Sequence, residues 1–209
     1  MILLPFWSSP IALADAIEPG HQTQTILVLG DSISAAYGIQ SEQGWVNLLQ
    51  KWVDQEELAW QVVNASVSGE TTGGGLARLP QLLSDHTPDI VLIELGGNDG
   101  LRGYPAKRVK GNLEQMVDLT AASGAQPVLL AMRIPPNYGP RYTRAFEEAF
   151  TVVAHSANVP LVPFFLESIA LEAGMMQDDG IHPTAAAQPL MLDSVVDHLA
   201  PLLRAPRLP

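Results

Sequence analysis

The sequence predicts an α/β protein built as a three-layer α/β/α sandwich, with a parallel sheet between two layers of helices. Short apolar runs alternate along the chain with segments that carry apolar residues at helical spacing. The runs are apolar at consecutive positions, which is typical of strands buried on both faces, as in parallel sheets. Turn signals are spread evenly and we find no repeat or linker. We therefore expect residues 17–209 to form a single domain.

Five strands and five helices are expected in alternation. The strands are predicted at residues 25–30, 60–65, 89–95, 126–132 and 159–162. The helices are predicted at residues 41–52, 76–83, 105–123, 141–157 and 185–203, and the third of them stops at Gly124. In open sheets of this kind, functional sites lie at the carboxyl ends of the strands. Polar residues that follow the predicted strands are therefore the candidates for a site.

Composition limits the classes of function. The chain has 209 residues, 47% of them hydrophobic, and a net charge of −11 from 11 basic and 22 acidic side chains. This balance argues against nucleic acid as a partner, because phosphate backbones are bound by basic surfaces. There is no cysteine, so disulfides, thiolate nucleophiles and cysteine-based metal sites are excluded.

The N-terminal segment predicts export. Residues 1–13 carry no charge and are largely apolar, and small residues follow at Ala12, Ala14 and Ala16. We interpret residues 1–16 as a signal peptide, which implies a periplasmic or secreted protein, although no basic residue precedes Lys51. A disordered extension is the alternative interpretation. No later stretch is long and apolar enough to suggest a transmembrane helix.

Two short segments could supply a catalytic triad. Ser32 follows the first predicted strand in Gly30-Asp31-Ser32, and His182 stands three residues after Asp179 near the other end of the chain. A serine hydroxyl needs a base to take its proton, and an imidazole base needs a group that orients it. We predict Ser32 as nucleophile, His182 as base and Asp179 as its partner. Asp178 is the competing candidate for the last role.

Ester cleavage also needs donors for the developing oxyanion. The candidates are the Ser32 N–H, the backbone of Gly69 in the loop after the second strand, and the side-chain amide of Asn98 after Gly96-Gly97. Ordinary turn chemistry is the alternative explanation for each glycine. The chain has no Gly-x-Ser-x-Gly segment, which disfavours the α/β-hydrolase fold. We expect no metal and no cofactor, since only one histidine is close to other motif residues.

These segments together resemble the GDSL, or SGNH, hydrolase superfamily, which is named for its Ser, Gly, Asn and His. The resemblance covers nearly the whole chain from about residue 25 to about residue 203, with isoleucine in place of the signature leucine at Ile33. Longer stretches, such as ELGGNDGLRG and MMQDDGIHP, are similar to a bacterial thioesterase I/protease I/lysophospholipase L1 group with arylesterase-like members. The resemblance implies a flavodoxin-like fold with five parallel strands and the same triad and oxyanion donors. It also implies hydrolysis of thioesters, lysophospholipids and aryl or short-chain esters without a metal.

Substrate specificity is expected in the loops around the serine. The candidates for substrate binding follow the third and fourth strands, and they are Gly100, Leu101, Tyr104, Ile134 and Tyr138. We predict small-molecule acyl esters or thioesters as partners and a monomeric enzyme. The alternatives are a carbohydrate acetyl esterase of the same superfamily and a non-catalytic binding domain on this scaffold.

Overall fold

The computed structural model describes residues 23–205, so the predicted signal peptide at 1–16 lies outside the described residues. Five parallel strands form one sheet in the order β2-β1-β3-β4-β5. Their bounds are β1 Gln24–Gly30, β2 Trp60–Asn64, β3 Ile90–Glu94, β4 Gln126–Leu130 and β5 Leu161–Val162. This is the flavodoxin-like strand order, and it confirms the predicted five-stranded parallel sheet.

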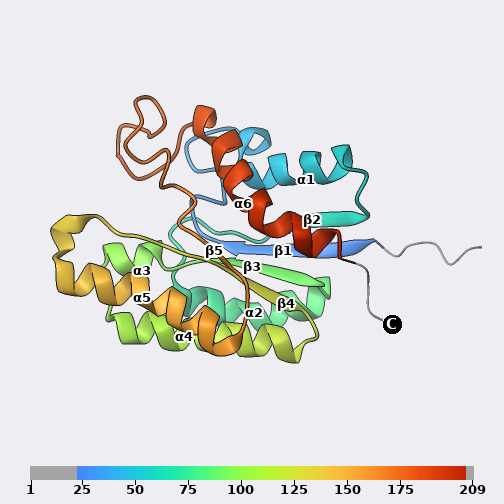
Figure 1. Ribbon diagram of the computed structural model, residues 1–209, viewed down its shortest axis with the longest axis horizontal. Coiled ribbons are helices and arrows are strands. Elements are labelled where there is room, and N and C mark those ends of the chain that lie inside the picture. Colours follow the sequence, from blue (N-terminus) through green and yellow to red (C-terminus); the bar gives the residue numbers. More distant parts are fainter. Residues whose placement is uncertain (1–22, 206–209) are drawn as a thin grey trace, which may run out of the picture.

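Helices cover both faces of the sheet (Figure 1). On one face α1 (Trp45–Gln55) packs against α6 (Gln188–Leu203). On the other face α4 (Ala106–Ala122) packs between α2 (Thr72–His86) and α5 (Pro140–Ala157). The predicted three-layer sandwich is therefore confirmed.

The two central strands explain the continuous apolar runs of the sequence. From Ile26 to Leu29 every side chain of β1 has no exposed surface, and all five residues of β3 are buried. Both strands lie between the two helical layers, so neither face alternates with polar residues. Large side chains from the helices, such as Trp45, Phe146 and Phe150, fill the space beside them.

Several element boundaries differ from the prediction. The predicted helix at 41–52 is a 3-10 turn at Ser41–Gln43 followed by α1, and the one at 185–203 opens with a 3-10 turn at Ala185–Ala187. The helix predicted at 76–83 begins earlier, at Thr72. Its first turn therefore includes three consecutive glycines, which are unusual in a helix. Thr71 caps its first turn by accepting a hydrogen bond from the Gly74 N–H, 3.2 Å long. A Cβ at Gly75 would meet the Leu95 side chain, so close packing explains why glycine is used in a helix there.

Residues 23–205 also contain one α-helix that was not predicted. The short helix α3 (Gly97–Leu101) follows β3 directly, and Gly96 before it has a φ of +124°. This conformation favours glycine and lets the chain turn sharply at the end of the strand. As a result Asn98 lies in the first turn of α3, at the carboxyl edge of the sheet. None of the helices in residues 23–205 is both long and apolar enough to cross a bilayer.

Candidate active site

Ser32 lies just beyond the carboxyl end of β1, the strand beside which the strand order reverses. Residues 32–38 form successive turns, with the N–H of Ala35 donating to the Asp31 carbonyl and that of Tyr37 to the Ser32 carbonyl. Ser32 is therefore followed by these turns and not directly by a helix, since the next α-helix begins only at Trp45. Ser32 is 8% exposed, so it is largely but not completely buried.

The three residues predicted as a triad are joined by hydrogen bonds. The Ser32 Oγ lies 2.9 Å from the His182 Nε2, and the His182 Nδ1 lies 2.6 Å from the Asp179 Oδ2. Residues from the two ends of the described chain thus meet at one edge of the sheet. The structure brings Asp179 to the imidazole, whereas the competing candidate Asp178 forms no hydrogen bond with His182.

A tight turn fixes the Asp179 carboxylate. Its Oδ1 accepts hydrogen bonds from the N–H groups of Ile181 (2.9 Å) and His182 (3.0 Å). Gly180 between them has a φ of +66°, a conformation that favours glycine. The hydrogen bond from His182, with these backbone hydrogen bonds, lowers the pKa of Asp179 to about 2. The carboxylate is therefore charged at neutral pH and can stabilise a protonated imidazole.

Two residues that our sequence analysis missed hold His182 in place. The Gln177 Nε2 donates to the carbonyl of Tyr37 (2.9 Å) and to that of Pro183 (3.0 Å), and the Gln177 N–H donates to the His182 carbonyl (2.8 Å). The Tyr37 ring lies against the imidazole, with 4.5 Å between ring centroids. Gln177 therefore ties the histidine loop to the turn after Ser32. The sequence does not reveal this role, because the partners are backbone carbonyls and one of them, that of Tyr37, is 140 residues away.

The oxyanion candidates Gly69 and Asn98 follow β2 and β3, the two strands that flank β1 in the sheet. Gly69 has a φ of +79° in the loop after β2, and its carbonyl accepts a hydrogen bond from the Arg102 Nη2 (3.1 Å). The Asn98 Nδ2 donates to the Asp31 Oδ2, 3.0 Å away. An amide nitrogen has two N–H groups, so this bond orients the amide and leaves the second N–H for a ligand.

Two buried acids lie beneath these residues. Asp31 is 2% exposed and Glu94, at the end of β3, is fully buried. The Glu94 Oε2 accepts hydrogen bonds from the Ser34 Oγ (2.6 Å) and the Asp31 N–H (3.2 Å), while the Glu94 Oε1 is buried without a partner. Burial raises the pKa of Asp31 to about 6, and burial followed by the charge of Asp31 raises the pKa of Glu94 well above its usual value.

We expect the free energy of unfolding of the Glu94→Gln variant to depend less on pH than that of wild type. A carboxyl whose pKa is raised on folding keeps a proton that the unfolded chain releases above about pH 4.5, so the free energy of unfolding falls as pH rises from there. Glutamine is neutral throughout and removes this contribution. Urea denaturation between about pH 4.5 and pH 7 should therefore give a flatter profile for the variant than for wild type.

The exposed Glu172 offers a matched control for this measurement. The Glu172→Gln variant should keep the wild-type pH profile, since this side chain is in the solvent. A Glu94→Gln variant with the wild-type slope would show that Glu94 does not retain a proton in the folded state.

The five candidates for substrate binding fall into two groups. Gly100 is buried in α3, where a Cβ would meet Ile134 and Phe146, and Ile134 itself is only 7% exposed. Leu101, Tyr104 and Tyr138 lie nearer the surface, and the Tyr138 Oη donates to the Leu101 carbonyl (2.7 Å). Gly100 and Ile134 thus pack in the interior, and the other three residues lie nearer to solvent.

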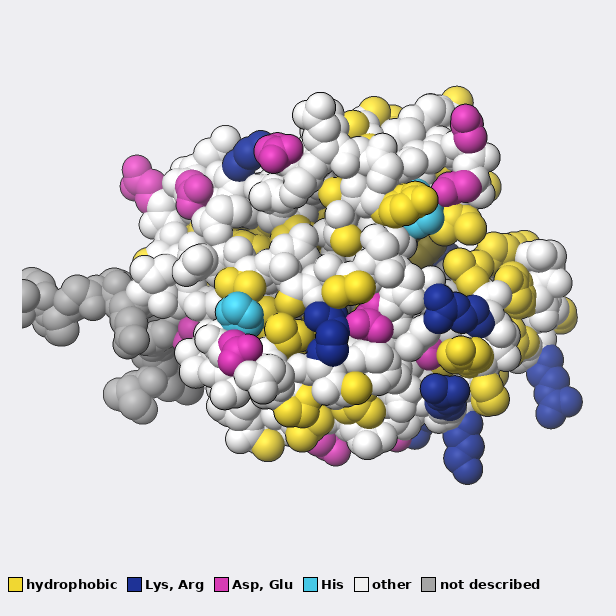
Figure 2. Space-filling model, turned by 180° about the vertical axis from the view of Figure 1, so that it is seen from behind, with side chains coloured by type: hydrophobic (Ala, Val, Ile, Leu, Met, Phe, Trp, Pro, Cys, Tyr) yellow, Lys and Arg dark blue, Asp and Glu magenta, His cyan; other side chains and the backbone are white. Residues whose placement is uncertain are grey.

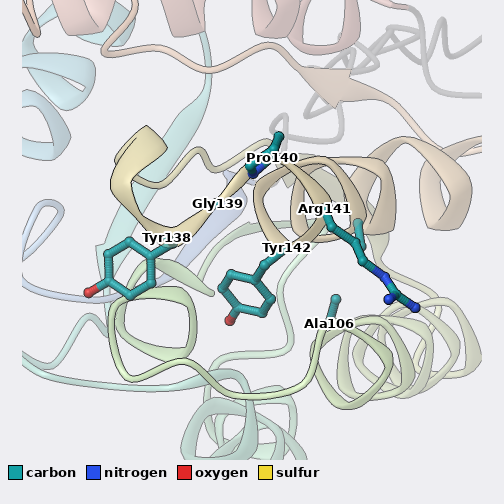
Figure 3. Close-up of a pocket in the computed structure, with 7 residues that line it drawn as sticks. Ala106, Tyr138, Gly139, Pro140, Arg141 and Tyr142 are labelled. Carbon is teal, nitrogen blue, oxygen red and sulfur yellow. The ribbon is translucent and has the colours of Figure 1, made fainter.

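A hollow of about 480 Å³ opens beside Tyr138, at the start of α5 (Figure 3). Tyr142 and Arg141 stand on opposite sides of it and Ala106 of α4 forms its base. The Tyr142 Oη donates to the Tyr104 carbonyl (2.6 Å), which links the hollow to the segment that follows α3. Within residues 23–205 we find no group of three or more His, Asp or Glu side chains placed to hold a metal ion.

A comparison with protein families identifies the chain. Residues 28–189 match the GDSL-like lipase/acylhydrolase family. The chain belongs to that family. The match includes the whole predicted site, and it confirms both the resemblance noted from the sequence and the prediction of a hydrolase.

Individual GDSL hydrolases are closely similar to this one. Esterase TesA of Pseudomonas aeruginosa is 54% identical over 180 residues, which are 86% of this chain and 90% of that protein. Thioesterase 1/protease 1/lysophospholipase L1 of Escherichia coli K12 is 46% identical over 180 residues, 86% of this chain and 85% of that protein. The crystal structure of esterase EstA from Pseudoalteromonas sp., inhibited by monoethylphosphonate, superposes with a TM-score of 0.84 at 47% identity, covering 87% of this chain and 100% of EstA.

Proposed function

We propose that this GDSL hydrolase cleaves carboxylic ester and thioester bonds through an acyl-enzyme formed on Ser32. The observation that carries the proposal is the hydrogen-bonded line from Ser32 through His182 to Asp179, with distances of 2.9 and 2.6 Å. Such a line lets a neutral imidazole take the hydroxyl proton as the oxygen attacks a carbonyl carbon. The names of the relatives, which include an esterase and a thioesterase/lysophospholipase, support fatty-acyl substrates.

The proposed reaction has two halves. In the first, the Ser32 Oγ attacks the acyl carbon while His182 takes its proton, and the imidazolium then gives that proton to the leaving alcohol or thiol. In the second, water attacks the acyl-enzyme with His182 again as base, and the acid is released with Ser32 restored. The Asp179 carboxylate, with a pKa of about 2, stabilises the imidazolium in both halves.

The oxyanion of each tetrahedral intermediate is assigned to three donors. They are the backbone N–H of Ser32, the backbone N–H of Gly69 and the second N–H of the Asn98 amide. Asp31 orients the Asn98 amide before substrate arrives, and Arg102 restrains the loop of the second donor through the Gly69 carbonyl. Donors fixed in advance act most strongly on charge that develops during reaction.

We also propose that the chain is exported to the periplasm or secreted, and that it acts as a monomer. The uncharged, apolar residues 1–13 and the small residues that follow them support the first part.

Active-site labelling tests the proposed function. A fluorophosphonate should form a covalent adduct with the wild-type protein, and mass spectrometry should locate it on the peptide that contains Ser32. In parallel, p-nitrophenyl esters of graded chain length should be hydrolysed, with a preference for fatty-acyl over acetyl groups. An adduct elsewhere would contradict the assignment of Ser32, and activity on acetyl esters alone would favour the carbohydrate acetyl esterase.

A further inference from the structure

Basic residues are concentrated in one part of this acidic protein. The segment from Arg102 to Arg144 contains seven of the 11 Lys and Arg residues and two of the 22 Asp and Glu residues. Its net charge is thus +5, whereas the rest of the chain carries −16. The segment runs from the end of α3 to the first turns of α5, so these charges lie around the carboxyl edge of the sheet and along α4.

Most of these cations have no acidic partner. Lys110 pairs with Glu114, and Arg133 with Glu147 and Glu167. The other five are exposed and form no ion pair within residues 23–205; they are Arg102, Lys107, Arg108, Arg141 and Arg144. Figure 2 shows Lys and Arg side chains gathered toward its right-hand end, the end that holds the first turns of α4 and α5. Unpaired cations on a strongly acidic chain leave a positive surface free for an anionic ligand.

One of these arginines contacts an oxyanion candidate, and another reaches the first turn of α2, which follows that candidate in the chain. The Arg102 Nη2 donates to the Gly69 carbonyl, 3.1 Å away. The Arg108 guanidinium stacks over the Tyr104 ring, 4.7 Å from its centroid, and its Nη2 lies 3.4 Å from the position that a Cβ would have at Gly73. Both side chains therefore reach the segment from Gly69 to Gly73, which begins at an oxyanion candidate.

A third arginine extends the positive surface outward. Arg141 lines the hollow of about 480 Å³, opposite Tyr142, whose Oη donates to the carbonyl of Tyr104 beneath Arg108 (Figure 3). The first turns of α4 and α5 carry no acidic residue, and neither helix has a side-chain cap, so their N–H groups add to the positive potential. Arg102, Arg108 and Arg141 thus extend the positive surface from Gly69 to the hollow.

We propose that Arg102, Arg108 and Arg141, the arginine cluster, bind phosphate on the leaving group of the substrate. The inference rests on the proposed function, since it names the class of ester or thioester that the site would favour. Guanidinium groups bind phosphate through paired, charge-assisted hydrogen bonds. The leaving groups that fit are a glycerophosphate, whose phosphate is a few bonds from the ester, and coenzyme A, whose phosphates lie further along the positive surface.

The decisive measurement compares two substrates with the same acyl chain. Lysophosphatidic acid carries a phosphate that 1-monoacylglycerol lacks, and both are assayed below their critical micelle concentrations. We define the phosphate preference as the ratio of kcat/KM for the first to kcat/KM for the second. Arg108→Gln and Arg141→Gln should each lower this preference about 10-fold to 100-fold, the range for losing one charge-assisted hydrogen bond. Arg108→Lys should lose less than Arg108→Gln, because it keeps the charge.

The chain offers a matched control in Arg204, which pairs with Glu56 beside α1. The Arg204→Gln variant removes the same charge far from the cluster and should keep the wild-type preference. A second pair, an acyl-coenzyme A and the neutral acyl thioester of N-acetylcysteamine, distinguishes the two sources of phosphate. A reduced preference in either pair supports the proposal and identifies the leaving group.

Three results would overturn the proposal. In the first, both arginine variants keep the wild-type preference in both substrate pairs. In the second, the variants lose activity equally on phosphate-bearing and neutral substrates, which would mean that the arginines support the fold or the site in general. In the third, the arginine variants differ from wild type only when the substrate is presented in anionic phospholipid vesicles, which would indicate docking on a membrane surface. If wild type hydrolysed neither member of either substrate pair, the proposed function itself would fail, and that outcome is separate.

Discussion

Turnover of a p-nitrophenyl ester should fall about 10⁶-fold when Ser32 is replaced by alanine. The Ser32 Oγ is the atom 2.9 Å from His182, and the hydroxyl two residues later cannot take its place, because the Ser34 Oγ is buried and donates to Glu94. Without the nucleophile, the oxyanion donors and the binding surface remain, so a residual acceleration over the reaction in water is expected. The kcat of the purified variant, measured against wild type, checks the prediction.

Ser68 provides the control for this variant. It is exposed in the loop after β2, one residue before Gly69. The Ser68→Ala protein should keep turnover close to that of wild type, while Ser32→Ala should still melt cooperatively, because the hydroxyl is a small part of a well-packed turn. If Ser32→Ala retained turnover within tenfold of wild type, Ser32 would not be the nucleophile.

The sheet was predictable from the sequence because its strands are buried on both faces. β1 and β3 read as continuous apolar runs, and each ends in glycine or is followed by it, so their limits were found to within one or two residues. β5 was less certain, since only Leu161 and Val162 pair with β4. The first residues of the helices were harder to predict. Three glycines at the beginning of α2 oppose helix formation locally, and only packing against Leu95 and capping by Thr71 explain them.

The site also contains residues that could be predicted from the sequence and residues that could not. Ser32, His182 and Asp179 could be named from spacing, because a short loop and a strand end constrain where each side chain can go. The residues that hold them could not. Gln177 and Arg102 contact backbone carbonyls, and these contacts exist only after distant loops come together. In the sequence Glu94 is one polar residue in an apolar strand, and the rise of its pKa follows from complete burial beside Asp31.

Asp31 connects the buried acids to the chemistry. One of its carboxylate oxygens accepts from the Ile33 N–H (3.0 Å) and the other from Asn98, while its own N–H donates to Glu94. The turn that carries Ser32 and the amide that faces the oxyanion are thus fixed by the same residue. A site arranged in this way resists small displacements of the donors, and these are costly for catalysis.

The Asp179→Asn variant should lose about 10⁴-fold in kcat, the second largest effect that we expect. The turn decides how the new amide sits. The N–H groups of Ile181 and His182 both donate to Oδ1, so the amide oxygen has to take that position. The amide nitrogen then faces the His182 Nδ1 and donates to it. The imidazole is held as the tautomer with its proton on Nε2, and it cannot accept the proton of Ser32.

Asp178 makes the comparison strict, because it is the adjacent carboxylate and is exposed. Asp178→Asn changes the net charge by the same amount at almost the same place, yet it leaves the hydrogen bonds of His182 intact. Its kcat should stay within a few-fold of wild type, since exposed charges act weakly through water and salt. Equal losses in the two variants would mean that the site responds to local negative charge, and the orienting role of Asp179 would have to be abandoned. A large loss in Asp179→Asn alone would tie catalysis to the tautomer that this one turn selects.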